Sequence, residues 1–291
     1  MKKKIISALL CSLVAVSLVG CGNTKKAGKS APSKETKAST EQASSSDKIT
    51  EKDIVSVGDF DIIPKKGMLL RYNGNETNLE IPSEIGGVKI VSIDGFGYKQ
   101  NLEKVVIPDG VTNIGESAFV GCIKLNSVAI PEGVTDIEDT AFISCVALEN
   151  IKLPSSLKTI GERAFDTCSK LKSIEIPDSV KSIGASAFSN CTALKSVVLP
   201  KGLTYIKKQT FSSSGIESIT IPESVTNIEE EAFNDCYHLA SVTLTSASTQ
   251  MERNAFEDAG KTMFNVVDKT QKDQLINSCP SGVKTENVYV K

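Results

Sequence analysis

The chain has 291 residues, of which 40% are hydrophobic and 23% are charged, so it holds one large domain or two ordinary ones and is not disordered throughout. Its formal net charge of -2 supplies no overall basic field, and we therefore expect no nucleic-acid partner. One His and no Trp leave few groups for acid-base chemistry near neutral pH and few flat rings for stacking on sugars or bases.

Residues 1–20 have the organisation of a secretory signal peptide. Residues 2–4 are lysines, an apolar run follows over residues 5–19, and the segment ends in Leu-Val-Gly-Cys at residues 18–21. This tetrapeptide resembles the lipobox of bacterial lipoproteins, and the resemblance implies cleavage before Cys21, a lipid thioether on that residue and acylation of the new amino terminus. An uncleaved membrane anchor is the alternative, but the run is shorter than the roughly 20 residues that a spanning helix needs.

The segment 21–52 is predicted to be a disordered tether. It consists mainly of Ser, Thr, Lys, Ala and Glu, with too few apolar side chains to offset the entropy of ordering. This tether and the lipid implied on Cys21 together predict a protein that lies outside the cytoplasm and is lipid-anchored to a bacterial cell membrane. The lysines of the tether either lie on anionic lipid headgroups or form a plain solvated spacer.

Internal repeats dominate the rest of the chain. Phe recurs at steps of 23 residues, with a single step of 22, at positions 96, 119, 142, 165, 188, 211, 233 and 256. Pro recurs in phase, and an apolar residue opens each unit, at Leu102, Leu125, Leu148, Leu171, Leu194, Ile216 and Leu239. A unit this short cannot bury its apolar residues alone, so the period predicts coils that stack into a solenoid.

One unit illustrates the expected coil. Val105 and Ile107 are two residues apart, which places them on one side of a short strand that Pro108 ends. Residues 116–119 have the composition of a single helical or 3-10 turn that buries Phe119. The expected fold is therefore mainly β, with short helical or 3-10 turns.

The repeat reads L-x-x-V/I-x-I/L-P-x-x-V/L-x-x-I-x-x-x-A/T-F-x-x-C and covers roughly residues 79–260. This pattern resembles the BspA-like leucine-rich repeats of bacterial surface proteins. The resemblance implies a right-handed leucine-rich-repeat solenoid with strands stacked along one side, and a role in adhesion or protein recognition outside the cell. It implies no cofactor and no catalytic residues.

Departures from the pattern set the expected boundaries. The repeats span 102–260, with an N-terminal cap at 53–101 and a C-terminal cap at 261–291 that contains a short helix near residues 269–276. The loop before Ile216 is one residue short, and Ser214 stands where other units have Cys. We expect a local change of curvature there, with Gly215 free to adopt a positive φ.

A column of cysteines recurs at Cys122, Cys145, Cys168 and Cys191, then at Cys236. One Cys per coil predicts buried free thiols, because coils two apart are too distant for bridging, although an occasional disulfide between adjacent coils stays open. No C-x-x-C or Cys/His cluster is present, so no metal site is predicted. The status of Cys279 is left open.

The outward positions of the repeated strand are the candidate ligand-binding surface. They carry small polar and charged side chains that suit a broad partner, although Ser and Thr also stack along strands with no ligand at all. The candidate residues are Lys104, Ser127, Asn150, Lys152, Ser173, Glu175, Ser196, Ser218 and Thr220.

Three classes of function remain. The leading hypothesis is a lipid-anchored recognition module that binds a protein or another extracellular polymer, and the alternative is a structural or self-associating envelope scaffold without a soluble ligand. An enzyme ranks third, because the only imidazole, His238, falls in a variable loop and no nucleophile motif such as G-x-S-x-G is present. Sequence selects no carboxylate pair, and residues 229–231, all Glu, are interpreted as a solvated face.

Overall fold

The computed structural model describes residues 49–258, 261–280 and 282–291, and all of them belong to one compact unit, Ile49–Lys291. The predicted signal peptide, Cys21 and the tether up to residue 48 lie outside the described residues. A 3-10 helix, η1 (Glu51–Asp53), crosses the predicted end of the tether, with Thr50 and Asp53 bonded to each other as a capping box.

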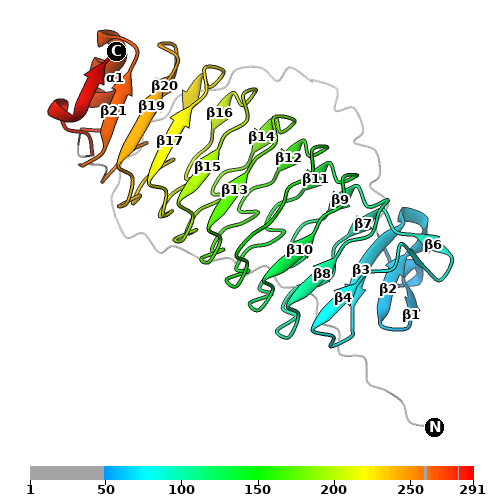
Figure 1. Ribbon diagram of the computed structural model, residues 1–291. Coiled ribbons are helices and arrows are strands. Elements are labelled where there is room, and N and C mark those ends of the chain that lie inside the picture. Colours follow the sequence, from blue (N-terminus) through cyan, green and yellow to red (C-terminus); the bar gives the residue numbers. More distant parts are fainter. Residues whose placement is uncertain (1–48, 259–260, 281) are drawn as a thin grey trace, which may run out of the picture. The chain divides into compact units, whose positions relative to one another are not determined.

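The repeats form a β-solenoid in which a coil contributes two short strands, except for the coil of residues 150–152, which contributes one (Figure 1). We call the longer strands, which come first in each repeat, the first ladder: β4 (Asn78–Glu80), β8 (Lys104–Val106), β10 (Ser127–Ala129), β13 (Ser173–Glu175), β15 (Ser196–Val198), β17 (Ser218–Ile221), β19 (Ser241–Leu244), β21 (Met263–Val266) and β22 (Val288–Val290). Neighbouring coils pair in parallel with equivalent residues opposite each other, as Val128 lies opposite Val105.

The second ladder is built from two-residue strands: β7 (Ser92–Ile93), β9 (Asn113–Ile114), β11 (Asp136–Ile137), β12 (Thr159–Ile160), β14 (Ser182–Ile183), β16 (Tyr205–Ile206), β18 (Asn227–Ile228) and β20 (Gln250–Met251). Each of these strands buries its second residue. Hydrogen-bonded pairing is continuous from β7 to β14 and from β16 to β20, with a break between β14 and β16. The predicted leucine-rich-repeat solenoid is thus the observed fold.

Both ends of the solenoid carry additional elements. At the N-terminal end, β1 (Val55–Val57), β2 (Phe60–Ile63) and β3 (Met68–Tyr72) are antiparallel, η2 (Pro64–Lys66) lies between β2 and β3, and β3 joins β7 in parallel. A hairpin of β5 (Glu84–Ile85) and β6 (Val88–Lys89) follows. At the other end, α1 (Lys269–Ser278) is capped by Asp268, whose side chain accepts from Gln271 N, and η3 (Thr285–Asn287) precedes β22.

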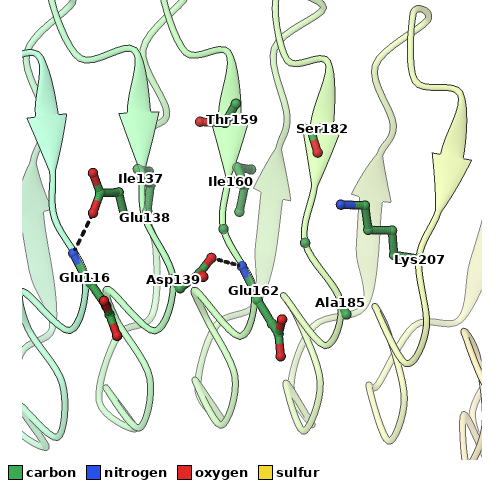
Figure 2. A pocket seen from close by; sticks show the side chains of 12 residues that line it. Glu116, Ile137, Glu138, Asp139, Thr159, Ile160, Glu162, Ser182, Ala185 and Lys207 are labelled. Carbon is green, nitrogen blue, oxygen red and sulfur yellow. Dashed lines mark hydrogen bonds between the residues drawn. The ribbon is translucent and has the colours of Figure 1, made fainter. Parts of the chain in front are cut away.

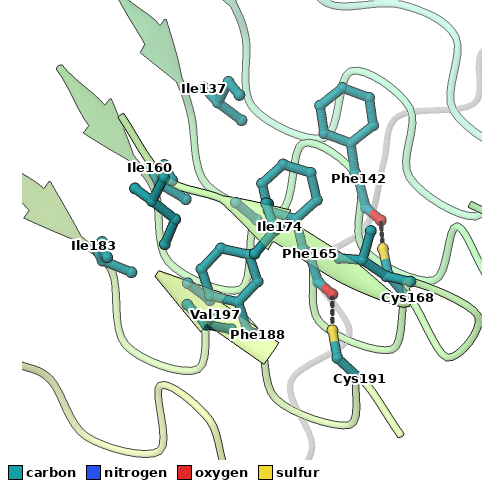
Figure 3. Packing of buried hydrophobic residues seen from close by; sticks show 14 of the residues in the cluster. Ile137, Phe142, Ile160, Phe165, Cys168, Ile174, Ile183, Phe188, Cys191 and Val197 are labelled. Atoms are coloured by element: carbon teal, nitrogen blue, oxygen red, sulfur yellow. Dashed lines mark hydrogen bonds between the residues drawn. The ribbon is translucent and has the colours of Figure 1, made fainter. Parts of the chain in front are cut away.

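The phenylalanine column forms the centre of the core, as Figure 3 shows for Phe142, Phe165 and Phe188. From Phe96 to Phe256 the rings are fully buried and stacked, with neighbouring centroids 5.0–5.7 Å apart. Tyr72 extends the column toward the N-terminal end, and Phe264 closes it edge-on at 5.2 Å from Phe256. The predicted burial of the repeated ring is therefore confirmed.

The segment predicted as a helical or 3-10 turn in each repeat is instead a series of hydrogen-bonded turns. Residues before and after Phe119 make consecutive turns, such as Ala118 N to Gly115 O at 3.2 Å, and the described 3-10 helices are η1, η2 and η3, outside the central coils. Ser117 has a φ of 59°, and this left-handed residue turns the backbone away from a helix. Phe119 N then donates to Ala141 O of the next coil at 2.7 Å, so bonds between coils replace bonds within a helix.

Two further expectations need correction. Residues 150–152 match the strand pattern but form no strand, which divides the first ladder between β10 and β13; nothing in the structure explains this. Gly215 does not have the predicted positive φ. Gly215 instead lets the backbone pass close to the preceding coil, because a Cβ there would lie 2.2 Å from Thr192 O. Next to this short loop, the pairing between β15 and β17 is reduced to Ser196 and Ser218.

The cysteine column consists of buried free thiols, including Cys279. Each repeat thiol donates to the carbonyl oxygen of a Phe in the preceding coil, as Cys168 does to Phe142 at 3.3 Å and Cys191 to Phe165 at 3.2 Å (Figure 3). Ser214 takes the same place in the irregular coil and bonds Cys236 Sγ at 3.4 Å. The column therefore satisfies buried carbonyl groups, and no disulfide joins the described cysteines.

Candidate binding surface

The predicted outward positions all reach solvent. In β8, β10, β13 and β15 the central residue is buried while the first and third are exposed, because successive side chains of a strand point to opposite faces. In-register pairing aligns the outward residues of neighbouring coils, so Lys104 lies beside Ser127 and Ser173 beside Ser196. We call the outward residues from β8 to β19, together with Asn150 and Lys152, the first-ladder face.

Two hollows mark this face. The first, of about 530 Å³, lies where residues 150–152 interrupt the ladder, and its lining includes Asn150, Lys152, Ser173 and Glu175. The second, of about 540 Å³, is lined by Ser196, Val198, Ser218 and Thr220 among others. The structure thus brings the predicted residues from Asn150 to Thr220 together around two depressions, and Lys104 and Ser127 line neither.

The charges on and beside the first-ladder face differ in whether they form ion pairs. Glu149 and Lys172 form an ion pair of 2.6 Å, and Lys172 lowers the pKa of the Glu149 carboxyl through a hydrogen bond and its charge. In contrast, Lys152 and Glu175, on neighbouring coils of the first hollow, make no ion pair within the described residues. The first hollow therefore holds the Glu175 carboxylate and the Lys152 ammonium outside any ion pair, with Glu132 in the same lining close enough to feel the charge of Lys152.

Apolar side chains lie on either side of this charged centre. Val106 is 43% exposed in β8, and Val198 is 64% exposed in β15. No aromatic residue stands at an outward position of the first ladder from β8 to β19. This composition suits a polypeptide or another polar polymer better than a ligand that must stack on flat rings.

A third hollow, of about 550 Å³, was not predicted from the sequence. Figure 2 shows it on the second ladder, where Glu116, Glu138, Asp139, Glu162 and Lys207 contribute to the lining. Gly161 and Gly184 also line it, at the position where neighbouring coils carry Glu138 and Lys207. The two glycines in place of larger residues are visible when the repeats are aligned, and this difference is the signal by which the sequence could have located the hollow.

The structure confirms the predicted exposure of His238 and corrects the interpretation of residues 229–231. His238 is exposed in its loop, as expected. Residues 229–231 are half-buried and contact the preceding coil, which corrects their interpretation as a solvated face. The Glu229 carboxylate accepts from Lys208 N at 2.8 Å, and that of Glu231 accepts from Gln209 Nε2 at 2.6 Å.

The described part of the chain holds neither a metal-binding cluster nor a membrane-spanning helix. No group of three or more His, Cys, Asp or Glu side chains there has an arrangement that holds a metal ion. Likewise, no helix within residues 49–258, 261–280 and 282–291 combines the length and apolar character needed to cross a bilayer.

Comparison with known proteins agrees with this geometry. The family description "BspA type Leucine rich repeat region" matches residues 89–181 and 160–279, with six copies of the repeat. The chain belongs to the BspA-type leucine-rich repeat family. No curated protein matches this BspA-type chain.

Solved structures share the fold. A leucine-rich repeat protein from Bacteroides ovatus is 28% identical with a TM-score of 0.61, and the match covers 77% of this BspA-type chain and 60% of that one. A leucine-rich repeat protein from T. pallidum is 25% identical with a TM-score of 0.58, over 81% of this chain and 98% of that one. The chain therefore spans 60% of the length of the Bacteroides protein.

Proposed function

We propose that the protein is a lipid-anchored recognition module outside the cytoplasm, which binds a protein or another extracellular polymer through the first-ladder face. The observation that carries this proposal is the pair of hollows on that face, which are lined by polar groups and, in the second hollow, also by the exposed Val198. Membership of a repeat family supports it, because solenoids present long surfaces built from equivalent positions. We further propose a role in adhesion.

The anchoring part of the proposal rests on the sequence at residues 18–21. Two or more acyl chains at the amino terminus give stable membrane attachment, whereas a single chain binds only marginally. We expect Cys21→Ser to release the protein from the membrane fraction or to leave an uncleaved precursor. Unchanged labelling by a radioactive fatty acid in this variant would refute the anchor.

The binding part is tested with the chain from residue 22 onward, applied to envelope preparations and to extracellular-matrix material. We expect saturable binding that a double change, Lys152→Glu with Glu175→Lys, weakens at least tenfold. Lys124→Glu, a charge change at an exposed loop position away from both hollows, is the control and should bind as the unaltered chain does. Binding that is not saturable, or concentration-dependent self-association as the only interaction, would contradict the proposal and favour a scaffold.

A further inference from the structure

The second ladder has a recurring bond between coils that involves a carboxylate and a backbone amide. Glu138 Oε2 accepts from Glu116 N at 3.1 Å, and Glu252 Oε2 accepts from Glu230 N at 3.2 Å. The same bond joins the Glu229 carboxylate to Lys208 N at 2.8 Å. In each case the carboxylate follows a strand of the second ladder and reaches the turn of the preceding coil.

This series is broken in the middle of the solenoid. By the same spacing, residue 207 would supply the carboxylate for Ala185 N, but that residue is Lys207. Within the described residues, Ala185 N has no hydrogen-bond acceptor. An amide that three other coils satisfy with a carboxylate from the next coil therefore lines the third hollow together with the ammonium group of Lys207.

The hollow exists because side chains are missing there. A Cβ on Gly161 would lie 2.4 Å from Asp139 N, and one on Gly184 would lie 2.3 Å from Glu162 N, so neither position accepts a side chain without a shift of backbone. In Figure 2 the Lys207 side chain extends over this gap toward Ser182. Its ammonium group makes no ion pair within the described part of the chain.

The opposite end of the hollow is acidic. Asp139 Oδ1 accepts from Glu162 N at 2.6 Å, and Glu138 is held by Asn113 Nδ2 at 2.7 Å and by Glu116 N. The carboxylates of Glu116 and Glu162 have no partner among the described residues. One hollow thus presents an ammonium with a free amide at one end and two free carboxylates toward the other.

We propose that this hollow binds an extended polypeptide segment whose acidic side chain is held by Ala185 N and Lys207. The acidic side chain reproduces the bond that Glu229 and Glu252 make within the protein itself. A basic side chain of the same segment pairs with Glu162, one to two coils away. Parallel strands are spaced by about 4.8 Å, and an extended chain advances about 3.3 Å per residue, so the two charges lie about two to three residues apart. Only a ligand that carries both signs satisfies both ends, which favours a polypeptide.

The carboxylate position is tested by nuclear magnetic resonance on the ¹⁵N-labelled chain from residue 22 onward, titrated with sodium acetate. We expect a saturable shift of the Ala185 amide signal and no comparable shift at Lys208 or Glu230, whose amides are already bonded. Lys207→Glu should supply the missing carboxylate from within and abolish the response, whereas Lys124→Glu should preserve it. An Ala185 response that Lys207→Glu leaves unchanged, or equal shifts at all three amides, would overturn the proposal.

The second position is tested with the peptide acetyl-Glu-Gly-Ser-Lys-amide against the same peptide with Ala in place of Lys. We expect the first to bind at least tenfold more tightly, and we expect Glu162→Gln to remove that difference. Lys207→Met keeps an unbranched side chain without its charge and should weaken both peptides while the amide spectrum stays that of the folded protein, which separates loss of binding from loss of folding. Equal affinity of the two peptides for the unaltered chain would overturn the paired-charge recognition.

Discussion

At the scale of single residues, the phenylalanine column shows how one position stabilises neighbouring coils together. Phe165 is fully buried, with rings at 5.3 and 5.4 Å on its two sides. Stacked rings at this separation gain energy beyond their burial, and each ring is part of two contacts between coils. Loss of one ring is therefore felt in three coils.

We expect Phe165→Ala to lower the free energy of unfolding by about 3–5 kcal/mol, because the lost contacts are accompanied by a cavity in a close-packed core. Denaturant unfolding measures this change. Tyr237→Ala is the control, since that ring is 73% exposed, and it should change stability by less than about 0.5 kcal/mol. A loss below roughly 1 kcal/mol at Phe165 would contradict the shared core.

Asp94 is a residue whose surroundings disfavour its charge. Burial raises the pKa of its carboxyl from 3.8 to about 6, and the nearby carboxylates of Glu138 and Glu116 add to the effect, against a hydrogen bond from Ser92 and the charge of Lys66. The side chain lies where Gly115 leaves space, since a Cβ on Gly115 would lie 1.9 Å from Asp94 Oδ1. The folded protein therefore holds a proton that the unfolded chain releases more readily.

The sign of the pH dependence follows from that difference. The contribution of Asp94 to stability is largest below about pH 4, falls as the pH rises toward 6, and is constant above. We expect Asp94→Asn to remove this fall, so the stability of the variant relative to the unaltered chain rises across that window. Unfolding curves between pH 4 and 7 measure it, with Asp109→Asn at an exposed position as the control. Parallel stability profiles for all three proteins would contradict the expectation.

At the scale of elements, the cysteine column behaves as a hydrogen-bonded strip of the core. Burial raises the pKa of the Cys122 and Cys236 thiols to about 11, and it also raises the pKa of the Cys145, Cys168 and Cys191 thiols well above the usual value. Reactivity requires the thiolate and access to solvent, and both are suppressed here. Ser214, which stands in this column in the irregular coil, bonds Cys236 Sγ of the following coil instead of a Phe carbonyl of the preceding one.

We expect the thiols of the chain from residue 22 onward to be unreactive toward a thiol reagent such as dithionitrobenzoate while the protein is folded. That chain holds six of the eight cysteines, all of them described and free. Unfolding in denaturant without a reductant should then release six reactive thiols. Four thiols after unfolding would show that one pair is oxidised, and rapid reaction of the native protein would show that the column is accessible.

At the scale of the whole described unit, sequence was sufficient for the repeating architecture and insufficient for its exceptions. The period of 23 residues places equivalent side chains opposite each other, so the burial of Phe165 and the exposure of Ser173 both follow from position in the repeat. Composition suggested a helical turn at residues 116–119, but left-handed Ser117 and bonds to the next coil determined the conformation.

For the candidate surfaces too, sequence predicts the regular positions but not the exceptions. Outward residues of the first ladder could be named from alternation alone, since a strand has a period of two. Alternation alone does not locate the hollows. The first arises where residues 150–152 form no strand, and the third lies where Gly161 and Gly184 replace larger residues, which shows only when each repeat is compared with its neighbours. These features depend on how a coil differs from its neighbours, which a consensus pattern averages away.

The ends of the solenoid determine whether the stack is stable as a whole. β21 pairs with β19, and Phe264 packs against Phe256, so the C-terminal elements cover the last coil of the repeats. We expect a chain ending at residue 260 to lose at least about 3 kcal/mol and to aggregate, because Val242, Leu244 and Phe256 become accessible and each fully buried side chain contributes about 1.5–3 kcal/mol. Thermal unfolding with light scattering measures both effects.

A chain that begins at residue 49 keeps every described element and is the control, expected to melt as the chain from residue 22 does. Equal melting temperatures for the chain ending at 260 and the full unit would show that the solenoid needs no cover at this end.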